Sequence, residues 1–73
     1  MNDSGKLLLK AATTYYKSKR DEALASLNVF FNNSVGIAEH SGFLEEIKKW
    51  IEVLTDAEDN LATLHKHFED EED

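Results

Sequence analysis

Eight apolar residues recur at alternating spacings of four and three in the second half of this 73-residue chain. The spacing averages about 3.5 residues, which on an α-helix places all eight side chains along one stripe. Such a stripe has to be buried, and a chain of this length has little other surface with which to bury it. The pattern therefore predicts helices that pack together, within one copy and between copies. The eight residues are Phe43, Ile47, Trp50, Leu54, Ala57, Leu61, Leu64 and Phe68.

Length and composition limit the ways in which such a chain gains stability. The sequence has no cysteine, which excludes disulfides and cysteine-based zinc sites. At 41% apolar and 32% charged residues it is too hydrophobic for a disordered chain, and oligomerisation is the remaining source of extra stability. No apolar run approaches the roughly 18 residues of a membrane span, and none near residue 1 resembles a signal-peptide core. We expect one domain, no membrane contact and a cytoplasmic location.

Charge is distributed unevenly along the sequence. Residues 1–20 carry five basic side chains and one acid, whereas residues 21–73 carry three basic side chains and fourteen acids. The net charge of −7 disfavours non-specific binding to nucleic acid. It also favours pairing between the basic first part and the acidic second part, as in an antiparallel hairpin.

The first segment has helical periodicity from about residue 6 to residue 33. Its apolar face consists of Leu9, Ala12, Tyr16, Ala23, Leu27 and Phe30, widened by Leu8, Tyr15, Leu24 and Phe31. Asp3 or Ser4 is the expected N-cap. Ser18 followed by charged residues also resembles a new helix start, but nothing there forbids helix, so we expect one continuous helix.

Asparagine, serine and glycine residues interrupt the periodicity between the two segments. They favour turns and predict a loop over residues 34–41, with Val35 and Ile37 closing one end of the core. The second helix is expected at about 42–68, capped by His40 or Ser41, before an acidic tail at 69–73 that frays. The predicted fold is all-α: one domain over residues 1–68, a two-helix antiparallel hairpin that associates into a four-helix bundle or higher helical oligomer.

Residues 27–64 carry the one resemblance that the sequence offers. Val35-Gly36-Ile37-Ala38-Glu39-His40, leading into Leu44-Glu45-Glu46-Ile47, resembles small uncharacterised helical proteins of tailed bacteriophages, in which a similar loop joins two helices. Ala38 and Ser41 depart from that pattern, which has glycine and proline at these places. The resemblance implies a two-helix accessory protein in the host cytoplasm, and it transfers no activity or functional residue.

The most suggestive cluster for a ligand joins two aromatic residues to three cations. Aromatic rings stack on bases and cations hold phosphates, so a nucleotide or nucleic acid is the ligand class that the cluster favours. Successive residues of a helix diverge by about 100°, however, and an amphipathic helix with snorkelling basic residues is the stronger interpretation. The cluster consists of Tyr15, Tyr16, Lys17, Lys19 and Arg20.

Catalytic and metal-binding patterns are weak. The sequence contains no cysteine nucleophile and no glycine-rich phosphate loop, so we expect no enzyme and no cofactor. His65 and Glu69 have a spacing that fits metal ligation from one helix, but two ligands are too few for a site. We therefore predict no metal.

Three functions remain open. The first is a homo-oligomeric interaction module; the second is a protein that sequesters a nucleotide or nucleic acid; the third is an acidic DNA mimic that blocks a host protein. Because Lys19 and Arg20 interrupt the stripe of the first helix, we expect a second subunit near Trp50 and Leu54, and Trp50→Glu to split the assembly. The predicted oligomer interface is Phe43, Ile47, Trp50, Leu54, Leu61, Leu64 and Phe68.

Overall fold

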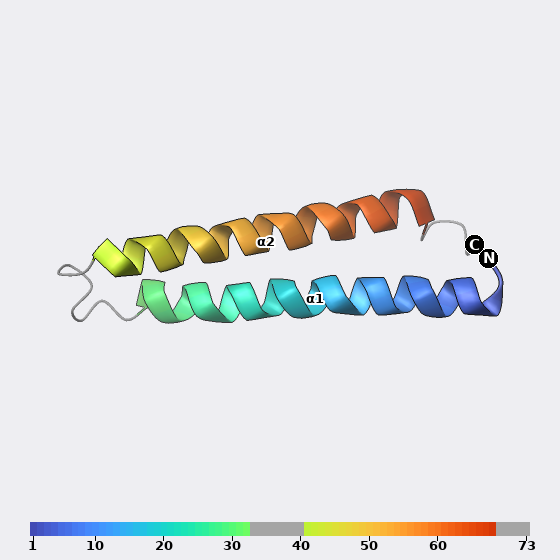
Figure 1. Cartoon of the computed structure of the whole chain (residues 1–73), viewed down its shortest axis with the longest axis horizontal. Coiled ribbons are helices and arrows are strands. Elements are labelled where there is room, and N and C mark those ends of the chain that lie inside the picture. The colour runs from blue at the N-terminus through green and yellow to red at the C-terminus, as the bar shows by residue number, and fades with distance from the viewer. Residues whose placement is uncertain (33–40, 69–73) are drawn as a thin grey trace.

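The computed structural model describes residues 1–32 and 41–68, which form two α-helices and contain no strand. Helix α1 spans Asp3–Asn32 and α2 spans Ser41–Phe68. The helices run antiparallel and side by side, with the start of α1 and the end of α2 at the same end of the molecule (Figure 1). The predicted all-α, two-helix fold is confirmed for these residues.

The start of α1 differs from the prediction. The side-chain oxygen Oδ1 of Asn2 accepts a hydrogen bond from the Gly5 amide at 2.7 Å, and the Asn2 carbonyl accepts one from the Lys6 amide at 2.9 Å. Asn2 is therefore the N-cap, and the expectation of Asp3 or Ser4 is wrong. Both of those residues lie inside the first turn, where the carboxylate of Asp3 suits the positive end of the helix dipole.

Helix α1 passes through Ser18 without a break, which confirms the prediction of one continuous helix. Helix α2 begins at Ser41 and ends at Phe68. The predictions for the loop, for Val35 and Ile37, for a cap at His40 or Ser41 and for the acidic tail fall outside the residues and side chains that the structure describes.

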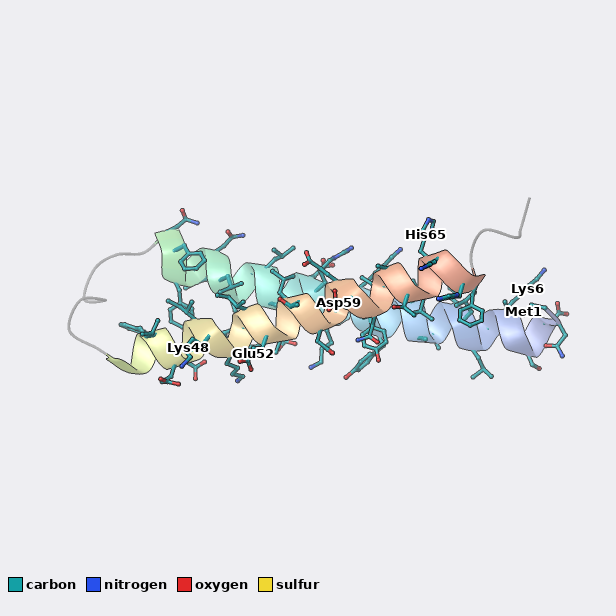
Figure 2. The ribbon with its side chains drawn as sticks, turned by 90° about the horizontal axis from the view of Figure 1, so that it is seen from above. Met1, Lys6, Lys48, Glu52, Asp59 and His65 are labelled. Atoms are coloured by element: carbon teal, nitrogen blue, oxygen red, sulfur yellow. The ribbon has the colours of Figure 1, made fainter. Side chains whose placement is uncertain are left out.

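One aromatic contact fixes how the two helices are aligned. The rings of Phe30 and Phe43 meet edge to face, with centroids 5.6 Å apart and planes inclined at 64°. In an antiparallel pair, a step back along α1 corresponds to a step forward along α2. Seven residues before Phe30 and seven after Phe43, Ala23 therefore lies level with Trp50. Fourteen residues from the same contact, Tyr16 lies level with Ala57. Seen from above, the two helices cross at a shallow angle near the middle of the molecule (Figure 2).

Small residues lie level with large ones along this interface. Ala23 is 0% exposed and Ala57 is 1% exposed, and each is level with a half-buried aromatic residue of the other helix. A methyl group opposite a large ring lets two helix backbones approach closely without leaving a cavity. The alternation of alanine and aromatic residues thus holds the helices together where a uniform row of leucines would leave them farther apart.

The side of α1 that faces α2 is partly polar. Residues at alternating spacings of three and four are half-buried or buried there, and we call them the α1 seam: Leu9, Thr13, Tyr16, Arg20, Ala23, Leu27 and Phe30. The register places Arg20 level with Leu54 and Thr13 level with Leu61. Arg20 is half-buried, and its Nε donates to Oδ1 of the neighbouring Asp21 at 3.0 Å. The apolar stripe of α2 therefore faces polar seam residues at Thr13 and Arg20.

Candidate functional site

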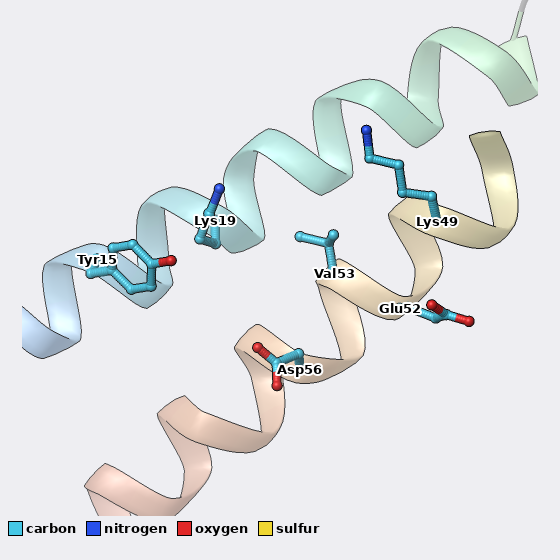
Figure 3. A pocket seen from close by; sticks show the side chains of 6 residues that line it. All are labelled: Tyr15, Lys19, Lys49, Glu52, Val53 and Asp56. Carbon is cyan, nitrogen blue, oxygen red and sulfur yellow. The ribbon is translucent and has the colours of Figure 1, made fainter.

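A shallow groove runs between the helices midway along the molecule. It has a volume of about 300 Å³ and is open to solvent. The groove is formed by Tyr15 and Lys19 of α1 and by Lys49, Glu52, Val53 and Asp56 of α2 (Figure 3). We call this side of the hairpin the groove flank. Val53 forms the apolar floor, and a ring, two amines and two carboxylates form the walls.

The charges around the groove balance one another. Lys19 and Lys49 supply two positive charges, and Glu52 and Asp56 supply two negative ones. Nζ of Lys19 lies 3.6 Å from Oε1 of Glu22, and Nζ of Lys49 lies 4.7 Å from the centre of the Trp50 ring. Both amines thus have partners, and the flanking carboxylates repel phosphate. This electrostatic environment suits a zwitterionic or neutral molecule better than a polyanion.

The structure separates the five residues of the predicted ligand cluster. Tyr15 and Lys19 both line the groove, and the rings of Tyr15 and Tyr16 meet edge to face at 5.0 Å. Tyr16 and Arg20 belong to the α1 seam and are half-buried against α2. Lys17 is exposed on the side of α1 away from the groove. The cluster is therefore no single surface, as the 100° step between successive helical residues requires.

The predicted oligomer interface lies largely against α1. Six of its seven residues are half-buried: Phe43, Ile47, Trp50, Leu54, Leu61 and Leu64. Phe68, at the end of α2, is 47% exposed. Much of the stripe is thus covered within one chain. A charge at Trp50 would disturb the packing beside Ala23 as well as any assembly, so Trp50→Glu does not isolate the contact between subunits.

The most exposed apolar surface that spans both helices lies on the side opposite the groove. Steps of seven residues from Phe30 along α1 and from Phe43 along α2 mark positions on the helix contact, and the residue after each of them is exposed on this side. We call this side the open flank: Lys10, Lys17, Leu24 and Phe31 of α1, and Leu44, Ile51, Glu58 and His65 of α2. The four apolar members are between 42% and 62% exposed. They occupy the half of the molecule near the Phe30–Phe43 contact, and the charged members occupy the other half.

The two flanks differ in how their apolar residues are placed. On the groove flank, Leu8, Tyr15 and Val29 of α1 are exposed, and five residues nearer the seam are half-buried: Ala12, Lys19, Ser26, Val53 and Asn60. On the open flank even leucine, isoleucine and phenylalanine stay in solvent. The loop-proximal half of the open flank therefore has exposed apolar residues on both helices.

Sequence reasoning identified Leu24 and Phe31 as residues that widen the apolar face, but it missed Leu44 and Ile51 as their counterparts on α2. The signal was present, since these two residues are seven apart and each follows a residue of the stripe. Only the antiparallel register shows that all four lie on one side of the hairpin.

The described residues offer little metal-binding chemistry. Within residues 1–32 and 41–68, no three histidine, aspartate or glutamate side chains gather closely enough to hold a metal ion. Neither α1 nor α2 contains an apolar stretch long enough to cross a membrane.

Comparison of the chain with models of protein families, with curated proteins and with solved structures finds no match.

Proposed function

We propose that this protein is a helical interaction module that acts by associating with further copies of itself. The observation that carries the proposal is that one hairpin buries very few apolar side chains. Among the described residues, only Ala23, Leu27 and Ala57 are buried, and none is a large side chain with full burial. A chain that folds alone needs a core of several large apolar residues, because each contributes about 1.5–3 kcal/mol when fully buried.

The shape of the molecule supports the same proposal. Its radius of gyration is 16.4 Å, whereas a compact chain of 73 residues has one of about 11 Å. Its extents are 54 × 17 × 16 Å, those of a rod only two helices across. Ten large hydrophobic residues are exposed within residues 1–32 and 41–68. A second rod beside the first removes much of that surface from water.

The two other functions considered for the sequence receive less support. Sequestration of a nucleotide or nucleic acid requires cations that are free to meet phosphate, and the groove adds two carboxylates beside its two amines. An acidic DNA mimic draws on the tail at 69–73, which lies outside the described residues. The bacteriophage accessory role that the loop sequence suggests is compatible with a self-associating module and remains a proposal.

Thermal unfolding at several protein concentrations tests the proposal. Because association stabilises only the folded chain, the Tm of an oligomer rises with concentration. We expect the far-UV circular dichroism melt to shift upward over a hundredfold increase in concentration. A Tm that stays constant over that range, together with a cooperative melt, contradicts self-association.

A further inference from the structure

We propose that the open flank is the surface on which a second copy docks, with the loop-proximal ends of the two hairpins at the same end of a four-helix bundle. The inference rests on the self-association proposed above and adds which surface is used and in which orientation. It starts from the four exposed residues Leu24, Phe31, Leu44 and Ile51.

The register pairs each open-flank residue of α1 with one of α2 at nearly the same height along the rod, and we call each such pair a rung. Leu24 lies within about 3 Å of the level of Ile51, and Phe31 within about 3 Å of the level of Leu44, since each pair is two residues from exact register. Lys17 and Glu58, seven residues farther from the loop, have the same offset, as do Lys10 and His65 beyond them. The flank is thus apolar on both helices in one half, and its other half carries one pair of opposite charges, Lys17 and Glu58.

Two orientations bring the open flanks of two copies face to face. In the aligned orientation, the two-fold axis runs along the rod, and α1 of each copy lies beside the antiparallel α2 of the other. In the reversed orientation, the axis is perpendicular to the rod and the loop-proximal half of one copy covers the other half of its neighbour. Both make closed dimers with the same surface on each copy.

The aligned orientation matches three of the four rungs with a suitable partner and sets Lys10 beside His65 in the fourth. Leu24 meets Ile51 of the second copy, and Phe31 meets Leu44, so that apolar residues cover apolar residues. Lys17 meets Glu58 of the second copy, and symmetry makes this pair twice. Neither Lys17 nor Glu58 forms an ion pair within residues 1–32 and 41–68, so both are available for it.

The reversed orientation mismatches the same rungs. At full overlap it places Ile51 of one copy over Glu58 of the other, Leu44 over His65 and Leu24 beside Lys10. The apolar side chains then meet charged ones, and those charges lose water without gaining a counter-charge at the same level. Charge and apolar pattern together therefore select the aligned orientation.

The size of the flank suits a dimer. The outline of the rod, 54 Å by 17 Å, is about 900 Å², so one face is just large enough to supply the roughly 800 Å² that each partner contributes to a typical stable interface. The groove flank is a poorer docking surface, because Lys19, Lys49, Glu52 and Asp56 surround its one apolar residue, Val53.

Substitution on the open flank tests the surface. Ile51→Glu places a carboxylate among apolar side chains, and we expect the mass in solution to fall from that of a dimer to that of one chain. Val29→Glu is the matched control, since Val29 is 62% exposed and does not belong to the open flank, and its dimer should persist. A dimer that survives Ile51→Glu overturns the proposed surface.

A charge exchange tests the pairing without touching an apolar residue, and so without unfolding the hairpin. Lys17→Glu and Glu58→Lys each place like charges opposite one another, and each should raise the dimer dissociation constant about tenfold at low salt. The double variant restores opposite charges and should recover most of the affinity. Single variants that leave the dissociation constant unchanged contradict the Lys17–Glu58 contact between copies.

Distances between spin labels test the orientation directly. The chain has no cysteine, so Lys66→Cys gives one labelling position near the end of α2. In the aligned dimer the two labels lie at the same end, within about 25 Å; in the reversed dimer they are separated by about 35 Å or more along the rod. A dimer with only the longer distance overturns the inference and leaves self-association standing, whereas a folded monomer removes both.

Discussion

Ala23 and Trp50 lie at the same level of the hairpin, so the smallest side chain of the α1 seam is level with the largest of the α2 stripe. Ala23 is fully buried and Trp50 is half-buried. The pair shows how two helices with few apolar residues still form a close contact: the small Ala23 side chain leaves room for the large Trp50 side chain.

Enlarging Ala23 should therefore destabilise the hairpin. Ala23→Leu adds three carbon atoms at a position with no exposed surface, and we expect a loss of about 1–3 kcal/mol in the free energy of unfolding. Urea unfolding at a fixed protein concentration measures it. Ala25→Leu is the control, because Ala25 is exposed two residues along the same helix. Equal stabilities for the two variants would show that Ala23 is not packed against α2.

The Phe30–Phe43 contact that fixes the register should show a measurable coupling. Edge-to-face aromatic pairs contribute about 0.5–1.5 kcal/mol beyond the burial of their area. A double-mutant cycle with Phe30→Leu and Phe43→Leu should give a coupling free energy in that range. Additive effects of the two substitutions would mean that the rings do not interact in solution and that the helices adopt another register.

Replacing Arg20 with an apolar residue should stabilise the hairpin. Arg20 occupies a seam position level with Leu54, and its ion pair with the exposed Asp21 contributes little because solvent screens it. We expect Arg20→Leu to raise the free energy of unfolding by about 1 kcal/mol. Ser18→Leu, at an exposed position of α1, is the control and should change it by less than half as much. A destabilised Arg20→Leu variant would contradict the seam assignment.

Removing the N-cap should shorten α1. Asn2→Ala deletes the oxygen that accepts the Gly5 amide, and the expected loss is about 0.5–2 kcal/mol. Asn2→Asp retains an acceptor and should keep the stability of the original chain. Hydrogen exchange of the amides in the first turn of α1 provides a local readout. Unchanged exchange rates in Asn2→Ala would rule out capping by this residue.

Periodicity predicted both helices because apolar residues recur at helical spacing in each segment. The stripe from Phe43 to Phe68 is helical throughout, and α1 continues through Ser18 as its lack of helix breakers indicates. The N-cap was misplaced because Asn2, Asp3 and Ser4 are all good caps, and the sequence offers no means of choosing among them. Composition therefore indicates that a cap is present, and only the hydrogen bond to Gly5 identifies it.

The surfaces of the hairpin were harder to predict than its helices. A second copy is expected to cover the stripe of α2 near Trp50; within one chain Trp50 and Leu54 are half-buried, and the contact between copies stays a prediction. The sequence alone does not show that Leu24 and Ile51 lie on one surface, because their proximity depends on how the two helices are aligned. The groove likewise combines Tyr15 and Lys19 with residues of α2 that no local motif marks.

The molar mass in solution tests the central claim most directly. Light scattering on the eluting peak of the full chain, at micromolar concentration and moderate salt, should give twice the 8.3 kDa of one chain or a higher multiple. A peak at the mass of a single chain, with helical circular dichroism and a cooperative melt, would show that one hairpin is stable alone and would contradict self-association.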